Sequence, residues 1–508
     1  MLSTTLVRNA LNNSAAVVLL VALELIITPC YLRYLGPVQY GVLLVTIVSG
    51  GYMSFLEFGL SEAVIKHLAE YHARESRERL QALIGVALTT YGAIGLALAS
   101  LMFAASSPLV GILNIPPHLR AVAVFALRIG SAGFLVTMTM RVFDALPRAL
   151  QRFDLSNRIM VGAAAAQTGS NLALMAAGKG LREIVIANVA VALAGAGANV
   201  VICRSLLPGI LFRPRWRGAM AKRLVSFGGT AAVGTLASNL ALQVLQLVIA
   251  LATPVANVAY FRTAARLASL PTLASRMVAP VVMPAASRLH GLGRRLALQE
   301  LHLRATRVIL LGGLPLAVAS AVFAGPLLRL WVGREVAAHA ALTAQLLTIG
   351  AVISCLGYSF ISLAHGAGRP QIVARANLGL GITAIVLSVP LVRVWGMPGA
   401  ALAWSLAHLL WVPTYFRPVL RLVTAGSGRR LVREAILLPA ALAAVLAGLE
   451  VGVLLLAGRS GKCLLVAGVP AVFYLAVGCV FALDRWEKRA LLSHLPWHSA
   501  ARPRAMEG

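Results

Sequence analysis

Long apolar segments alternate with short polar ones along nearly the whole chain of 508 residues. A helix needs about 20 mainly apolar residues to cross the hydrocarbon core of a bilayer, and this criterion selects fourteen segments. The pattern therefore predicts an all-α polytopic membrane protein with about 14 transmembrane helices. The candidate spans are residues 12–32, 39–59, 82–104, 121–143, 156–177, 183–204, 226–252, 255–286, 305–325, 341–363, 372–392, 397–416, 434–457 and 463–483.

The two halves of the chain resemble each other at an offset of about 217 residues. Pro37, after the first span, falls on Pro254, after the seventh. Arg152 falls in the same way on Arg369. Because six spans per copy is an even number, both copies enter the membrane from the same side and form a parallel repeat, as in alternating-access transporters. The expected organisation is an N-terminal six-helix lobe (1–223), a C-terminal six-helix lobe (224–424), and two additional transmembrane helices with a basic cytoplasmic tail (425–508).

Composition and charge agree with a membrane protein and exclude a soluble nucleic-acid-binding protein. Hydrophobic residues make up 59% of the chain and charged residues only 12%, against about 25% in soluble domains. The net charge of +29 is distributed by topology, since 32 Lys and Arg residues fall on one side of the predicted spans and nine on the other. We therefore expect both termini in the cytoplasm and no nucleic-acid partner.

Three arginines lie inside the eighth span. At 100° per residue, Arg262, Arg266 and Arg276 fall within one sector of about 80°. Charged side chains at membrane depth face protein or a water-filled cavity, and guanidinium groups match phosphate oxygens bidentately. The stripe therefore indicates a cationic cavity for an anionic substrate and argues against a metal site. Amide side chains share one face of the seventh span, namely Asn239, Gln243 and Gln246.

Two acidic residues leave a structural alternative open. Glu24 lies in the first span and Glu57 in the second, which are the spans equivalent in the repeat to the seventh and eighth. Carboxylates on facing helices would neutralise the arginines, and the polar residues would then serve only to hold helices together.

Motifs for nucleotide-driven or enzymatic chemistry are missing. Residues 458–463 read G-R-S-G-K-C, which lacks the first glycine of a phosphate-binding loop and ends in cysteine. The sequence contains no G-x-S-x-G or H-E-x-x-H motif. We therefore expect neither an enzyme nor a cofactor.

Three motifs resemble the MOP superfamily, specifically its Wzx-type polysaccharide flippases. They are YLGPVQYG at residues 34–41, FGLSEA at 58–63 and VAYFRTAARL at 258–267. The resemblance implies two MATE/MOP-like lobes and a flippase that moves an undecaprenyl-pyrophosphate-linked oligosaccharide across the bacterial inner membrane by alternating access. Such a repeat unit feeds O-antigen, exopolysaccharide or capsule assembly, with membrane lipids, a polymerase and glycosyltransferases as partners.

On this reading, Arg262, Arg266 and Arg276 hold the pyrophosphate, and the three amides of the seventh span bind sugar hydroxyls. Glu24 or Glu57 is the candidate for coupling to a proton or sodium gradient.

Three other functions stay open. A peptidoglycan-precursor (lipid II) flippase shares the superfamily and the cationic cavity. A MATE-type drug or cation antiporter would favour acidic residues in the cavity, so the arginines disfavour it. A membrane glycosyltransferase or polymerase would need a large extracytoplasmic loop with acidic residues, whereas these loops are short and almost free of Asp and Glu.

Overall fold

The structure, a computed structural model, describes residues 4–55, 60–73, 76–150, 152–222, 224, 242–424 and 428–457, with the single positions 470, 473, 474 and 477. The described part is helical and contains no strand. Its N-terminal helices are α1 (Thr4–Tyr34), α2 (Gly36–Phe55), α3 (Leu60–Ala73), α4 (Arg77–Ile112), α5 (Pro117–Thr139), α6 (Arg141–Ala149), α7 (Phe153–Ala176) and α8 (Leu181–Leu206).

The C-terminal half follows the same pattern of long helices joined by short turns. Its helices are α10 (Ala256–Ser269), α11 (Thr272–Gly291), α12 (Arg295–Val322), α13 (Ala324–Val332), α14 (Arg334–Gly366), α15 (Pro370–Trp395), α16 (Met397–Trp411), η1 (Val412–Tyr415), α17 (Phe416–Thr424), α18 (Gly428–Leu431), η2 (Val432–Ile436, a π-helix) and α19 (Leu437–Ala457). A further apolar helical segment, Leu242–Ala252, precedes α10.

The all-α membrane fold is confirmed. All predicted spans except the seventh and the fourteenth fall on described helices. The seventh is described only from Leu242 to Ala252, and the fourteenth lies outside the described helices. Nine helices of the described part are long and apolar enough to cross a bilayer on their own. The total of fourteen spans stays a prediction.

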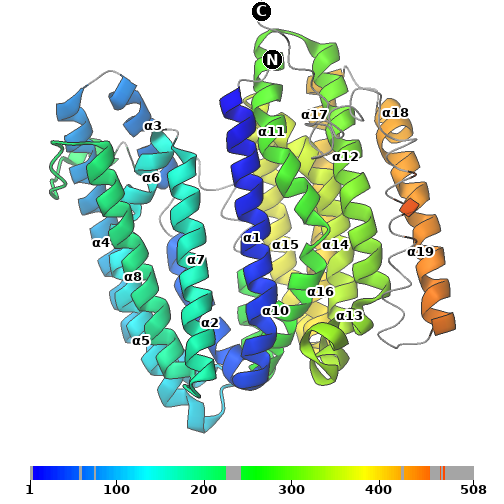
Figure 1. The fold of residues 1–508 in the computed structure, drawn as a ribbon, viewed down its shortest axis with the longest axis horizontal. Coiled ribbons are helices and arrows are strands. Elements are labelled where there is room, and N and C mark those ends of the chain that lie inside the picture. The colour runs from blue at the N-terminus through cyan, green and yellow to red at the C-terminus, as the bar shows by residue number, and fades with distance from the viewer. Residues whose placement is uncertain are drawn as a thin grey trace, which may run out of the picture.

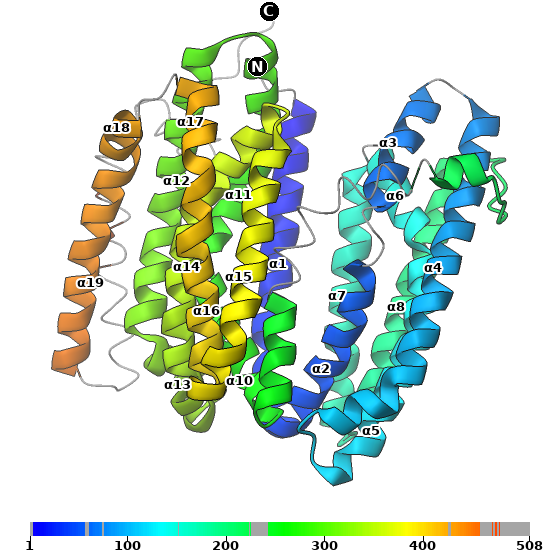
Figure 2. The same ribbon diagram turned by 180° about the vertical axis from the view of Figure 1, so that it is seen from behind.

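Two groups of helices stand side by side (Figures 1 and 2), one containing α2 to α8 and the other α10 to α17. The packing within them is equivalent. α5 packs against α4 and α8 in the first group, and α14 packs against α12 and α16 in the second. Likewise α7 packs on α8, and α15 on α16. This correspondence agrees with the predicted repeat, whose boundaries at residues 223 and 424 stay predictions.

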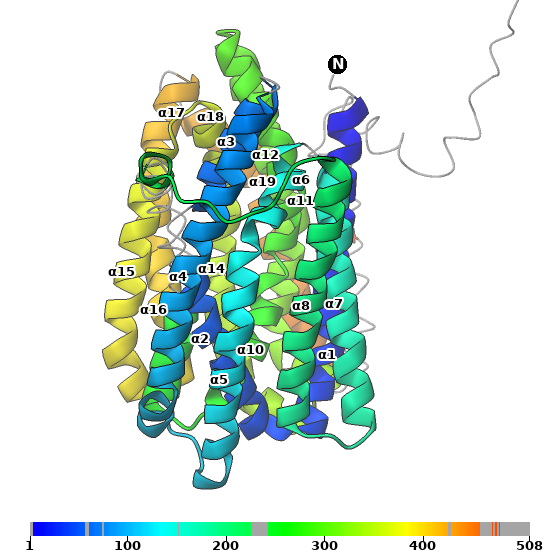
Figure 3. The ribbon, with the colours of Figure 1, turned by 90° about the vertical axis from the view of Figure 1, so that its left-hand side faces the viewer.

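The groups contact each other at one end and diverge toward the other. At the contacting end, the Asn114 side-chain amide donates to the carbonyl oxygens of Leu251 (2.9 Å) and Thr253 (3.3 Å). A Cβ on Gly41 of α2 would lie 2.2 Å from the carbonyl oxygen of Val255, so only glycine permits this approach. Figures 1 and 2 show the helices diverging toward the end that carries α3, α6 and α17, and Figure 3 shows them running roughly parallel over the height of the molecule.

Proline lies within two predicted spans that bear on the site, and in each a side chain donates to the carbonyl that lacks its helical donor. Pro29 lacks an N–H, which leaves the carbonyl of Leu25 without its helical donor, and Trp331 Nε1 donates to that oxygen at 2.7 Å. Pro271 similarly breaks the predicted eighth span into α10 and α11. The carbonyl of Leu267, which has no donor at Pro271, accepts hydrogen bonds from the Leu270 N–H at 3.2 Å and from the Ser320 hydroxyl at 3.4 Å.

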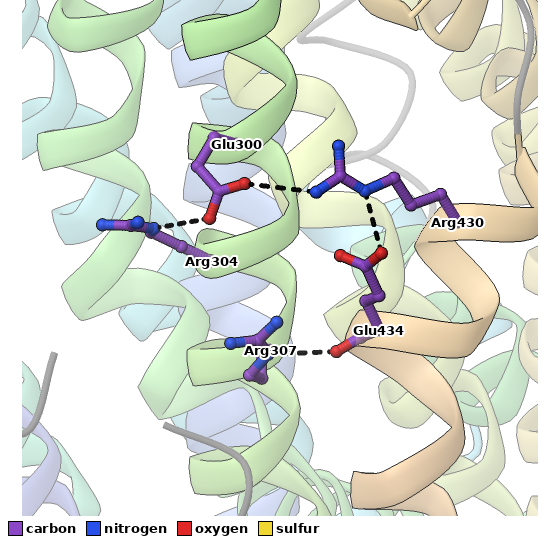
Figure 4. A network of polar contacts seen from close by, with 5 residues as sticks. All are labelled: Glu300, Arg304, Arg307, Arg430 and Glu434. Carbon is purple, nitrogen blue, oxygen red and sulfur yellow. Dashed lines mark hydrogen bonds and ion pairs between the residues drawn. The ribbon is translucent and has the colours of Figure 1, made fainter. Parts of the chain in front are cut away.

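The helices after residue 427 attach to α12 through a charged network (Figure 4). Arg430 of α18 contacts Glu300 of α12 at 3.7 Å and Glu434 at 2.9 Å. Arg304 pairs with Glu300 at 2.8 Å, and Arg307 donates to the Glu434 carbonyl oxygen at 3.1 Å. Below the network, α19 packs its apolar face on α12. The extra C-terminal segment is thus joined to the second group alone among the described contacts.

Candidate functional site

Charged side chains meet where α1, α2 and α10 come together. Arg266 of α10 forms an ion pair with Glu24 of α1 through both of its terminal nitrogens. Arg262 lies one helical turn earlier, and Tyr40 of α2 interacts electrostatically with Glu24 and both arginines. We call Glu24, Tyr40, Arg262 and Arg266 the arginine cluster. It joins helices of the N-terminal repeat to α10 of the C-terminal one.

A chain of polar contacts fixes the N-terminal side of this cluster. Tyr40 is hydrogen-bonded to Thr28, and its ring stacks on Tyr31 with centroids 5.1 Å apart. The side-chain amide of Asn171 donates to the Tyr31 hydroxyl at 2.6 Å and to Asn188 Oδ1 at 2.8 Å. The contacts run from α10 through α2 and α1 to α7 and α8, so the cluster is anchored in the first helix group.

The arginine cluster carries excess positive charge within the described residues, since two guanidinium groups face one carboxylate. The paired side chains are still accessible, with exposed fractions of 25% for Arg266 and 42% for Glu24. Desolvated cations at membrane depth are costly unless an anion neutralises them. The geometry therefore suits an anionic ligand that competes with Glu24 for the guanidinium donors.

A second polar site lies inside the second helix group. It is a cavity of about 360 Å³, which we call the C-terminal cavity. Arg276 of α11 lines it, and no acidic side chain is among its lining residues in the described part of the chain. The other polar or aromatic lining residues are Ser269, Thr272, Ser354, Tyr358, Asn377, Trp404, His408 and Tyr415.

Polar groups of the C-terminal cavity fall into two classes. The hydroxyls of Ser269 and Thr272 donate to carbonyl oxygens of their own helical segment and are satisfied. Within the described part of the chain, no hydrogen bond or ion pair engages the guanidinium of Arg276, the amide of Asn377 or the hydroxyl of Tyr358. These three groups are therefore available to a ligand in the cavity.

A cavity of similar size, about 370 Å³, lies in the first group between α2, α4, α5 and α8. We call it the N-terminal cavity. Several of its polar groups are already engaged: Thr46 and Ser131 donate to the carbonyls of Leu43 (2.8 Å) and Arg128 (2.7 Å), and Asn188 Oδ1 accepts from Asn171. No charged residue is among those of its lining residues that the structure describes.

The predicted arginine stripe is divided between two places. Arg262 and Arg266 belong to the arginine cluster, whereas Arg276 lines the C-terminal cavity. The break at Pro271 ends the single helix on which the predicted 80° sector rested. Glu24 takes the structural role left open for it, as the partner of Arg266.

The remaining predicted site residues are the three amides of the seventh span and the second carboxylate. Gln246 is buried, at 2% exposure, and its Nε2 donates to the Leu242 carbonyl at 3.3 Å. Gln243 is partly buried on the same segment. Asn239 and Glu57 lie outside the described residues. The substrate-binding and coupling roles assigned to these residues stay predictions.

Sequence reasoning missed several polar residues that the structure brings to these sites. Tyr40, Asn171 and Asn188 support the arginine cluster, and Tyr358 and Asn377 line the C-terminal cavity. Each is a lone polar residue in an apolar span, which was the available signal. Among the described residues, no group of His, Cys, Asp and Glu is placed to hold a metal ion.

Fold and charge distribution together define a polytopic transporter built from two helix groups. The sequence profile of the polysaccharide biosynthesis protein family matches residues 32–339, and the chain belongs to this family. It is 24% identical over 408 residues to the uncharacterized membrane protein EpsK of Bacillus subtilis, covering 78% of this chain and 79% of that protein. The protein is therefore a membrane flippase or transporter and not an enzyme.

Solved structures confirm the fold class. The lipid II flippase MurJ in an inward closed conformation superposes with a TM-score of 0.71 at 13% identity, covering 94% of this chain and 99% of that one. An inward-facing multidrug resistance MATE transporter of the MOP superfamily gives 0.66 at 15% identity, covering 80% and 94%. An outward-facing MATE transporter gives 0.60 at 14%, covering 83% and 96%. The likeness establishes a MATE/MurJ-like fold.

Proposed function

We propose that this protein flips an undecaprenyl-pyrophosphate-linked oligosaccharide across the bacterial cytoplasmic membrane for O-antigen, exopolysaccharide or capsule assembly. The observation that carries the proposal is the arginine cluster, in which Arg262 and Arg266 share one described carboxylate. Planar guanidinium groups stay protonated when desolvated and bind phosphate oxygens bidentately. The pyrophosphate binds Arg262 and Arg266 and displaces Glu24.

This displacement links substrate binding to movement of the helix groups. Glu24 and Arg266 come from the two repeats, so the ion pair stabilises one relative position of α1 and α10. A pyrophosphate that binds the Arg266 guanidinium breaks this ion pair. It therefore binds the conformation with the ion pair and the conformation without it with different affinities. Such a difference in affinity is required for a ligand to shift the population from one conformation to the other. A freed Glu24 is then able to accept the coupling proton.

The basic residues and the relatives support the remaining parts of the proposal. Helices α3, α6, α17 and α18 lie at the same end of the molecule, the first two on one group and the last two at the other (Figure 1). The predicted cytoplasmic loops, which hold most of the Lys and Arg residues, fall at that end. We infer that both termini are cytoplasmic and that the groups diverge toward the cytoplasm. A polymerase and glycosyltransferases of the same assembly pathway are the proposed partners.

Export of glycan by cells tests the function. The gene is replaced by Arg262→Ala and Arg266→Ala variants, and Arg288→Ala, an exposed arginine on α11, is the matched control. The proposal predicts loss of surface glycan in both cluster variants and normal export in the control, at equal protein levels in the membrane. Intact export in both cluster variants refutes the pyrophosphate assignment.

A lipid II flippase is the alternative that the MurJ-like fold keeps open, and the family assignment favours polysaccharide export over it. Rescue of cells depleted of their lipid II flippase, without rescue of cells lacking their polysaccharide flippase, would establish the alternative. A MATE-type drug antiporter is disfavoured by the excess of arginine over carboxylate in the cluster.

A further inference from the structure

The C-terminal cavity is separate from the arginine cluster although α10 contributes to both. Ala265 lines the cavity, while Arg266, the next residue, pairs with Glu24 of α1. Consecutive helical side chains point about 100° apart, so the two sites occupy different faces of α10. Arg276 lies on α11, beyond the break at Pro271. It lines the cavity, whereas no residue of the arginine cluster is among the described lining residues of the cavity.

The cavity combines one cation with uncharged polar and aromatic groups. Arg276 is exposed to it, and none of its described lining residues carries a carboxylate. Asn377 and Tyr358 add an amide and a phenol that no described residue engages by a side-chain hydrogen bond, and Trp404 adds an indole surface. A few convergent polar groups in an otherwise apolar pocket of about 300–1,000 Å³ are typical of a small-molecule site. The volume of about 360 Å³ lies at the lower end of that range.

We propose that the C-terminal cavity binds an acidic sugar of the transported oligosaccharide, with Arg276 paired to its carboxylate. A single guanidinium matches a carboxylate bidentately, and an unpaired cation in this setting needs an anion. The apolar face of the sugar ring packs on Trp404, while Asn377 and Tyr358 hydrogen-bond its hydroxyls. The inference rests on the proposed function and adds to it a substrate class, an oligosaccharide that carries a uronic acid.

Binding of three soluble probes to the full-length protein in lipid nanodiscs tests the inference. The probes are methyl β-D-glucuronide, its neutral analogue methyl β-D-glucoside, and farnesyl pyrophosphate, each measured by calorimetry. We expect Arg276→Gln to weaken glucuronide binding by at least about tenfold and to leave farnesyl pyrophosphate binding unchanged. Arg288→Gln, on the same helix but outside the cavity, removes the same charge and serves as the matched control.

The outcomes separate this inference from the proposed function. Equal glucuronide binding by the wild-type protein and Arg276→Gln overturns the inference, as does wild-type binding of the glucoside as tight as that of the glucuronide. If Arg276→Gln weakens farnesyl pyrophosphate binding, Arg276 belongs to the pyrophosphate site and the inference is also overturned, while the proposed function stands. If Arg262→Gln and Arg266→Gln leave farnesyl pyrophosphate binding intact, the proposed function fails instead. Loss of glucuronide binding in Arg276→Gln alone, with farnesyl pyrophosphate bound normally, supports the inference.

Discussion

The N-terminal and C-terminal cavities have nearly the same size but opposite chemistry. The N-terminal cavity, of about 370 Å³, is lined by hydroxyl groups that donate to carbonyls of their own helices and by Asn188, whose Oδ1 accepts a hydrogen bond from Asn171. The C-terminal cavity, of about 360 Å³, presents Arg276 and polar groups that no described side chain engages. Size alone therefore does not identify a binding site. The useful distinction is whether polar groups are left for a ligand.

The two halves of the predicted repeat also differ at the positions of the arginine cluster. At the offset of 217 residues, Arg262 corresponds to Val45 and Arg266 to Ser49. Equivalent positions of a shared scaffold thus carry charge in one copy and small or apolar side chains in the other. The N-terminal half contributes a carboxylate instead, Glu24 of α1, which pairs with Arg266 of α10.

The largest expected effect comes from reversing the charges of the pair that joins the repeats. Arg266→Glu places a carboxylate opposite Glu24, and we expect glycan export to fall by at least about thirtyfold, because disrupting a hydrogen-bonded charge pair costs about 2 kcal/mol or more. The double variant with Glu24→Arg restores the attraction and the stability of the folded protein but leaves export low, since the guanidinium has moved to α1. Full export by the double variant would mean that the pair is only structural.

A second change tests whether the groups need their close contact at the end that carries Gly41. Gly41→Val introduces a Cβ where the Val255 oxygen lies 2.2 Å away, so the two groups must separate there. Spin labels at His118 and Ala338, both exposed, are expected to report longer distances in this variant. Gly162→Val on α7, where a Cβ meets open space, is the control. Unchanged distances in Gly41→Val would contradict the contact.

A third substitution removes an unengaged polar group from the C-terminal cavity. Asn377→Leu keeps the side-chain size but removes one amide, and we expect transport to fall by about tenfold with little change in the melting temperature, since one hydrogen bond contributes about 0.5–1.5 kcal/mol. Flipping rate and thermal unfolding are measured on the same preparation. A large loss of stability without a specific loss of transport would assign Asn377 to packing.

The smallest effect is expected in the N-terminal cavity. Ser131→Ala removes a hydroxyl that only bonds its own helix, so the transport rate should stay within about twofold of the wild type and stability within about 1 kcal/mol. The flipping assay and chemical denaturation provide the two readouts. A tenfold loss of transport would show that this cavity also binds substrate and would remove the contrast between the two groups.

Much of the fold followed from hydropathy because the bilayer imposes helices of known length, and most predicted spans fall on helices. The site was harder. Periodicity placed three arginines on one face, but Pro271 breaks that helix, and the carbonyl of Leu267 is bonded by Ser320 from another helix. The pairing of Glu24 with Arg266 spans 242 residues and is invisible to local patterns. The roles of Asn377 and Tyr358 depend on which helices enclose a cavity, which spacing along the chain does not encode.

Flipping in reconstituted liposomes tests the central claim most directly. The purified protein is given a fluorescent undecaprenyl-pyrophosphate-linked oligosaccharide, and its appearance in the opposite leaflet is followed. The account predicts flipping by the wild-type protein and by Arg288→Gln, and its loss in both Arg262→Gln and Arg266→Gln. Wild-type rates in the two cluster variants, or equal flipping of a lipid-linked sugar without phosphate groups, would contradict it.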